Sequence, residues 1–330
     1  MKKSLFVLGV AVAALASCTQ SEVLEVAENR AIGFDAFVNN QTKAVTPVTE
    51  ISSSQFYVFG EYASTTDSWS KEGNAFNNDR GDATYYWEPN MIYRFGAYAN
   101  GLSGQLSNAS FDAANSTLKF TGYTPKDLDL VAAVSADINS LGATESNNAN
   151  SVPLTFKHML SQVKLTFTTD AASTYQLTIS NVSISNAVST ADGTLVGNGG
   201  TPTWSNTTAS AGYAYEDFAG EGQMVSKNAP VNQVKLVIPQ GSTNNITVTF
   251  TATVKAEGEG TTTFTANLGH SLAETANTWE PGYCYNYTAN VELDKVLDGL
   301  DGTEVPILFE PSVEGWQTEQ NVPVTPVPAS

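Results

Sequence analysis

Alternation of apolar and polar residues is the main pattern of this chain, and it predicts short β-strands. The first alternating segment, 31–38, places four side chains on one face: Ile32, Phe34, Ala36 and Val38. Similar alternation, or a short apolar run, predicts further strands over 55–62, 84–87, 92–99, 117–121, 128–134, 152–157, 162–168, 175–184, 233–238, 245–254, 261–266, 283–293 and 305–309. Polar stretches such as NNDRGD (77–82) predict the turns between them.

No segment with a helical pattern lies between these predicted strands, which indicates an all-β protein. Thr, Ser, Asn, Gly and aromatic residues are abundant, a composition typical of β-proteins. We therefore predict an all-β fold of two tandem β-sandwich domains rather than a parallel α/β sheet. The polar stretch before residue 152 favours an N-terminal domain at 31–151 and a C-terminal domain at 152–318. The last segment, 319–330, carries three prolines and predicts an extended tail.

The N-terminus has the order of a bacterial lipoprotein signal. Two lysines precede an apolar run too short to span a bilayer, and small residues lead to Cys18. This order predicts a signal peptide at 1–17 and acylation of Cys18, followed by a polar tether at 18–30. An ordinary secretory signal with a chance cysteine is the alternative. We expect an exported protein held on a membrane by the lipid on Cys18.

Charge narrows the range of partners. The formal net charge is −18, from 15 basic and 33 acidic residues. Nucleic acid is not expected as a partner, because binding to its phosphates requires clustered Lys and Arg. Anionic lipid does not attract such a chain either, so membrane contact must be covalent.

Residues suited to catalysis are few. Neither histidine, His158 or His270, has the spacing of a metal ligand pair, and no nucleophile-elbow or P-loop motif occurs. No catalytic residue, metal or cofactor is predicted. A pair of glycosidase-type carboxylates has no sequence motif, because the fold sets the distance between them, and is therefore not excluded. His158 is expected to be a buried, hydrogen-bonded side chain. Cys284 lies inside an alternating strand and is expected to be a small, buried apolar side chain.

Two clusters have both a structural and a functional interpretation. Five aromatic residues are candidates for a platform that binds a glycan: Tyr85, Tyr86, Trp87, Tyr93 and Tyr98. Alternation on strands would instead place half of them in a core. Three aspartates are candidates for calcium ligands: Asp294, Asp298 and Asp301. Their spacing differs from that of an EF-hand loop, so a solvated acidic turn is favoured.

The stretch VPLTFKHMLSQVKLTF (152–167) resembles the start of the second domain in the fimbrillin family of the Bacteroidota. That family comprises the lipoprotein precursors of type V pili and related surface adhesins. Three more stretches agree with it: AIGFDAFVNNQTKA (31–44), WEPGYCYNYTANVEL (279–293) and FEPSVEGWQ (309–317). The resemblance implies tandem transthyretin-like, Greek-key sandwiches, no enzymatic activity, and a place on the outer membrane or cell surface, in the fimbrium.

The resemblance also implies a mechanism of assembly. In such precursors a trypsin-like protease cuts after Arg or Lys, the N-terminal strand leaves, and other pilin subunits fill the groove by β-strand addition. Cleavage after Arg30 would release only the tether. Cleavage after Lys43 would also remove the strand that carries Ile32, Phe34, Ala36 and Val38. We favour Lys43, and a chain that is never cut is the alternative.

The C-terminus leaves the role within a filament open. Val322, Val324 and Val327 alternate only partly, and prolines interrupt the main-chain donors that a donor strand needs. A tip, accessory or anchoring subunit is therefore as compatible with the sequence as a stalk subunit. The alternative function is a monomeric surface lipoprotein that binds host or glycan ligands without polymerising.

Overall fold

The described part of the chain has strands as its main regular structure and very little helix, which confirms the all-β prediction. The computed structural model describes residues 31–38, 49–50, 55–66, 69, 74–101, 104–140, 151–170, 175–209, 212–255, 260–268, 278–298 and 309–315. Within these ranges the helical elements are the 3₁₀ turn η2 (Glu216–Phe218) and the six-residue helix α2 (Leu293–Asp298). Neither has the length or apolar composition needed to cross a membrane.

The largest sheet has eight strands and contains the first strand of the described chain. Its order is β2-β1-β10-β8-β5-β3-β4, with β9 paired to β5. The strands are β1 (Phe34–Val38), β2 (Thr49–Glu50), β3 (Tyr57–Ala63), β4 (Asn74–Arg80), β5 (Ile92–Asn100), β8 (Leu130–Val134), β9 (Ile138–Asn139) and β10 (Val152–His158). The strictly alternating burial of β10 follows from the pleat, which sends successive side chains to opposite faces.

A second sheet shares a core with one face of the first. It has the order β14-β13-β7-β6, from strands β6 (Ala109–Asp112), β7 (Thr117–Tyr123), β13 (Val188–Val196) and β14 (Thr203–Ala209). Tyr98 and Leu130 of the large sheet and Leu118, Phe120 and Leu195 of the second sheet are all buried in this core. Burial of these rings and aliphatic chains is the main attraction between the two sheets.

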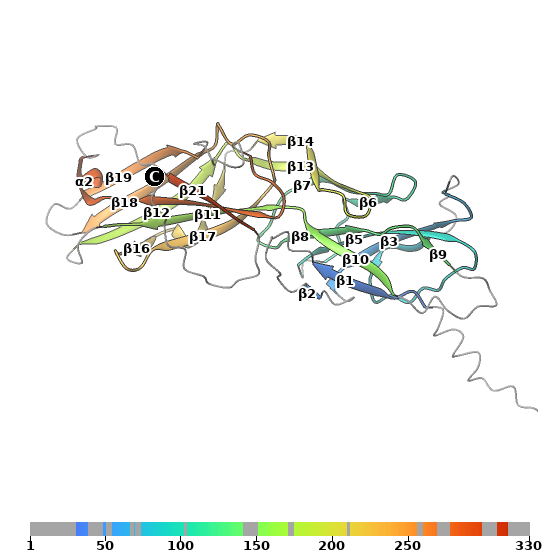
Figure 1. Cartoon of the computed structure of the whole chain (residues 1–330). Helices are drawn as coiled ribbons and strands as arrows, with labels where there is room; N and C mark the ends of the chain where they lie inside the picture. The colour runs from blue at the N-terminus through green and yellow to red at the C-terminus, as the bar shows by residue number, and fades with distance from the viewer. Residues whose placement is uncertain are drawn as a thin grey trace, which may run out of the picture.

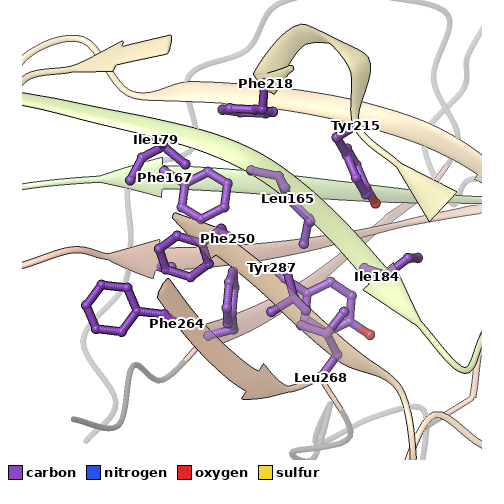
Figure 2. Close-up of a cluster of buried hydrophobic side chains, with 14 of the residues drawn as sticks. Leu165, Phe167, Ile179, Ile184, Tyr215, Phe218, Phe250, Phe264, Leu268 and Tyr287 are labelled. Atoms are coloured by element: carbon purple, nitrogen blue, oxygen red, sulfur yellow. The ribbon is translucent and has the colours of Figure 1, made fainter. Parts of the chain in front are cut away.

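Two further sheets enclose the largest core. One has the order β17-β11-β20-β21, and the other β15-β12-β18-β19 with β16 beside β12. Their bounds are β11 (Ser161–Thr168), β12 (Gln176–Ser185), β15 (Tyr213–Ala214), β16 (Gln223–Val225), β17 (Val231–Val237), β18 (Thr247–Lys255), β19 (Gly260–Asn267), β20 (Tyr283–Asn290) and β21 (Phe309–Gly315). Figure 2 shows how Phe167 of β11, Phe250 of β18 and Tyr287 of β20 meet between these sheets.

The segment β10–β11 joins the two ends of the molecule. Figure 1 shows β1, β3, β5 and β10 at one end, and β11, β12, β18 and β19 at the other. The chain passes from β10 to β11 through Met159 and Leu160, both fully buried. Strand β10 follows the polar stretch before residue 152 yet pairs with β1 and β8, so backbone pairing crosses the expected domain limit at that residue. The second sheet crosses it as well, by pairing β7 with β13.

Three predictions about local structure were wrong. The NNDRGD stretch (77–82) was expected to be a turn, but residues 77–80 belong to β4 (Asn74–Arg80) and the turn begins only at Gly81. Polar side chains are tolerated in β4 because it is the edge strand of its sheet. The expected strand at 84–87 forms only an isolated bridge, between Tyr86 and Ala31. The strand expected over 283–293 ends at Asn290. Asp294 and Asp298, expected in a solvated acidic turn, belong instead to the short helix α2.

Candidate functional site

Strand β1 lies in the large sheet beside β10, which is more than a hundred residues away in sequence. The two strands run parallel, in a register that extends from Phe34 opposite Val152 to Val38 opposite Phe156. The Val152 amide also donates a hydrogen bond to the Gly33 carbonyl at 2.8 Å. On its other side β1 pairs with β2 at Phe37 and Val38. Main-chain pairing therefore joins this strand to residues that are distant in sequence.

The side chains of this segment alternate between core and solvent. Ile32 and Ala36 are buried, Phe34 is partly buried, and Gly33 and Asp35 are exposed. The side chain of Val38, predicted to share the buried face, lies outside the described residues. This alternation is the arrangement by which an added strand is held: its backbone pairs with a neighbour while every second side chain enters a core.

Phe34 makes the main side-chain contacts of β1. Its ring meets those of Phe56, Phe76 and Phe95 edge-to-face, at centroid distances of 5.9, 5.2 and 5.4 Å. Phe76 belongs to β4, at the opposite end of the strand order from β1. A flat sheet could not bring these two strands together, so the large sheet curls around this aromatic cluster of Phe34, Phe56, Phe76 and Phe95.

A second contact closes the curl at the start of the segment. The Ile32 amide donates to the Tyr85 carbonyl at 2.8 Å, and Ala31 forms an antiparallel bridge with Tyr86. The segment 31–38 thus lies between β10 on one side and the Tyr85–Tyr86 segment on the other. Its departure would expose a long edge of β10 together with the buried faces of Phe56 and Phe76.

The residues predicted to attach and release this strand fall outside the described residues. They are the lipidation site Cys18 and the candidate cleavage sites Arg30 and Lys43. The predicted tail at 319–330 also lies outside them. Lys43 belongs to the segment between β1 and β2, so its position in the chain follows the whole of β1.

The two buried polar side chains predicted from sequence are found as expected. His158 is 9% exposed, and its Nδ1 lies 2.6 Å from Oδ2 of Asp129. Cys284 is also 9% exposed and belongs to β20. His270 and Asp301 lie outside the described residues. In the described part of the chain no three His, Cys, Asp or Glu residues gather in a way that could hold a metal ion.

The predicted aromatic platform is mostly core. Trp87, Tyr93 and Tyr98 are buried, whereas Tyr86 is 50% exposed. The Tyr98 hydroxyl donates to Oδ1 of Asn78 and accepts from the Leu106 amide, each at 2.7 Å. Burial raises the pKa of Tyr98 to about 12, so its hydroxyl stays protonated. These side chains stabilise the interior and do not present a flat surface to a glycan.

Sequence reasoning missed the residues that receive β1. Phe76 directly precedes the predicted NNDRGD turn and was assigned to no strand, whereas Tyr85 and Tyr86 fall in the strand expected at 84–87. Phe76 is buried and the polar residue after it is exposed, as in a half-buried strand. This pattern is a weak signal, because only one apolar residue carries it.

Comparison with known proteins gives a family match over nearly the whole chain. A fimbrillin-like family profile matches residues 24–316. A fimbrial protein from Bacteroides vulgatus has a similar fold at 16% identity, with a TM-score of 0.55 over 87% of this chain and 100% of that one. The fimbrial anchor protein Mfa2 from Porphyromonas gingivalis aligns at 12% identity and a TM-score of 0.36, over 86% of this chain and 97% of its own. No curated protein sequence matches the chain.

Proposed function

Because the chain belongs to the fimbrillin-like family, we propose that it is a structural or adhesive subunit of a cell-surface pilus and not an enzyme. In this proposal β1 is a temporary strand. A protease removes it, and a strand of another subunit takes its place beside β10. Each subunit is thereby completed by its neighbour, through the same kind of main-chain pairing that holds β1.

The placement of β1 is the observation that carries this proposal. It is a short segment, paired in parallel with β10, and its Phe34 ring enters the aromatic cluster from one edge of the sheet. Without β1, the edge of β10 and the apolar cluster would be open to water and to aggregation. An incoming strand with alternating apolar residues would restore both the pairing and the burial.

The proposal assigns the cut to Lys43. Cleavage after Arg30 would leave all of β1 (Phe34–Val38) attached to the folded chain, whereas cleavage after Lys43 severs it. In the same proposal residues 1–17 direct export, Cys18 carries the lipid that holds the precursor on the outer membrane, and a trypsin-like protease makes the cut. The anchor and β1 then leave together.

The last described strand, β21, bears on the place of the subunit in the filament. Strand β21 is the outer strand of its sheet and pairs antiparallel with β20, from Phe309 opposite Ala289 to Gly315 opposite Tyr283. Phe309 is buried in the core of that sheet. We therefore propose that β21 stays with its own subunit, and that the chain acts as a tip, accessory or stalk subunit.

Limited trypsin digestion of the purified precursor tests the proposal. We expect a product that begins at Ala44 and forms oligomers in size-exclusion chromatography with light scattering. The variant Lys43→Gln should resist this cleavage and remain monomeric, whereas Arg30→Gln should behave as wild type. Mass spectrometry of the surface-extracted protein then reports which N-terminus exists in the cell.

Three outcomes would count against the proposal. A surface form that still begins at lipidated Cys18 would refute removal of the strand. A product that starts at Ala31, as cleavage after Arg30 would give, would refute the choice of Lys43. A product that starts at Ala44 yet stays monomeric would favour the alternative, a surface lipoprotein that binds a host or glycan ligand without polymerising.

A further inference from the structure

A cavity of about 350 Å³ lies where three parts of the chain meet. Lys157 and His158 come from the end of β10, and Thr201 and Pro202 from the loop between β13 and β14. Glu280 comes from the turn before β20, and Tyr283 is the first residue of β20. The volume is at the lower end of the range of small-molecule sites, about 300–1,000 Å³. The cavity therefore has room for a ligand of about one ring.

Hydrogen bonds fix the walls of this cavity before any ligand binds. The Ser161 hydroxyl donates to the Glu280 carbonyl, and the Gly282 amide to the Leu160 carbonyl, each at 2.8 Å. Nε1 of Trp204 donates to the Met159 carbonyl at 2.7 Å and ties the β13–β14 hairpin to the same segment. All three contacts hold the walls to the buried connection between β10 and β11. A preformed site of this kind loses little entropy when it binds a ligand.

Two charged side chains on this cavity have unused hydrogen-bonding capacity. The Lys157 ammonium has three N–H donors and, among the described residues, makes one hydrogen bond, to the Gly199 carbonyl at 2.6 Å. Burial away from water lowers the pKa of Lys157, and no carboxylate of the described residues forms an ion pair with it. The main-chain N–H and C=O of Glu280 are both bonded, but its exposed carboxylate has no hydrogen-bond partner in the described structure.

We propose that this cavity binds one neutral saccharide ring. Sugar hydroxyls both donate and accept, so they complement a carboxylate that only accepts and an ammonium that only donates. Glu280 would accept from two hydroxyls and Lys157 would donate to a third oxygen. Pro202 and Tyr283 provide apolar surface for the carbon face of the ring. An anionic ligand would meet Glu280 in a chain of net charge −18, and a cation would meet Lys157.

This site is independent of strand replacement. The pairing of β1 with β10 ends at Phe156, before Lys157 and His158 reach the cavity. The proposal goes beyond assembly of a filament, since it gives the subunit a place to hold a glycan. Failure of one proposal would leave the other intact.

Saturation-transfer NMR and titration calorimetry on the purified full chain test the site. The probes are the methyl glycosides of glucose, galactose, mannose, fucose and N-acetylglucosamine, with methyl glucuronide as the charged comparison. We expect saturable binding of at least one neutral glycoside. Because hydrogen bonds to charged groups are worth about 1.5–3 kcal/mol, Glu280→Gln and Lys157→Met should each weaken binding by about tenfold or more.

Matched controls separate loss of the site from loss of the fold. Glu221→Gln and Lys119→Met make the same changes at exposed positions outside the cavity and should bind as wild type. Glu280→Gln should also keep the wild-type melting temperature, because its carboxylate makes no hydrogen bond or ion pair within the described chain. The proposal is overturned if no neutral glycoside binds, if methyl glucuronide binds more tightly than all of them, or if Glu280→Gln binds as well as Glu221→Gln.

Discussion

Replacement of Phe34 by alanine should loosen β1 from the large sheet. The Phe34 ring makes three edge-to-face contacts, with Phe56, Phe76 and Phe95, at centroid distances of 5.2–5.9 Å. Each such pair is worth about 0.5–1.5 kcal/mol beyond the area it buries. Burial of the partly exposed Phe34 ring adds about 1 kcal/mol. We therefore expect a loss of about 3 kcal/mol, at the lower end of the range for a buried Phe→Ala substitution.

Hydrogen exchange measured by mass spectrometry gives the sharpest assay, because it reports on β10 directly. The amides of β10 that face β1 exchange when β1 detaches, so a loss of about 3 kcal/mol should speed their exchange roughly 100-fold. Peptides from β18 and β19, which belong to another sheet, should not change. Urea denaturation followed by circular dichroism provides the matching global measurement.

Phe37→Ala is the control, because it makes the same change on the same strand. Phe37 is partly buried but takes part in no ring pair within the described chain. Phe37→Ala should therefore lower the free energy of unfolding much less than Phe34→Ala. Equal losses for the two variants, or a loss below about 1 kcal/mol for Phe34→Ala, would refute the view that the aromatic cluster holds β1 in place.

Two further predictions concern the rest of the fold. A hydrogen bond from Arg94 lowers the pKa of Asp137, whose Oδ2 lies 3.1 Å from Nη2 of Arg94. This pair should therefore stabilise the protein fully above the unfolded-state pKa of Asp, about 3.9. The stabilisation should be lost as the pH falls through the lower pKa of Asp137 in the folded state. Asp137→Asn should lower the free energy of unfolding by at most about 1 kcal/mol near pH 7, because the carboxyl is 40% exposed. Urea titrations should show this difference between variant and wild type vanishing near about pH 2. A difference that grows as the pH falls would contradict the role given to this pair. Gly222→Ala should destabilise more than Gly220→Ala in thermal melts, since both residues have a positive φ (+73° and +64°), but only at Gly222 would the new Cβ lie 2.2 Å from the Ile179 carbonyl oxygen. Equal costs at the two glycines would show that backbone strain alone matters.

Much of the strand content could be predicted from sequence, because alternation is a local property of the pleated backbone. Strands β5, β10, β11 and β18 lie within one or two residues of their predicted ranges. His158 is buried as expected, since Val152, Leu154 and Phe156 at alternate positions of β10 mark it as inward-facing. Cys284 is buried as its residue type predicts, although it is out of phase with the buried residues Tyr285 and Tyr287 of β20. Strands β13 and β14 were missed, because their Thr, Ser, Asp and Gly residues lack an apolar face as clear as that of β10.

The sequence by itself determined that the chain forms strands, which face is apolar in those strands that alternate clearly, and which catalytic and metal-binding motifs are missing from it. Only the tertiary structure decided which strands are neighbours. Alternation at 31–38 marks Ile32 and Ala36 as inward-facing, but it carries no information that β1 pairs in parallel with β10 or that Phe34 meets Phe76. The cavity lined by Lys157 and Glu280 likewise could not be predicted from the sequence. Pairing and cavities depend on main-chain groups and side chains brought together from distant segments, whereas a pattern of apolar residues records only the local pleat.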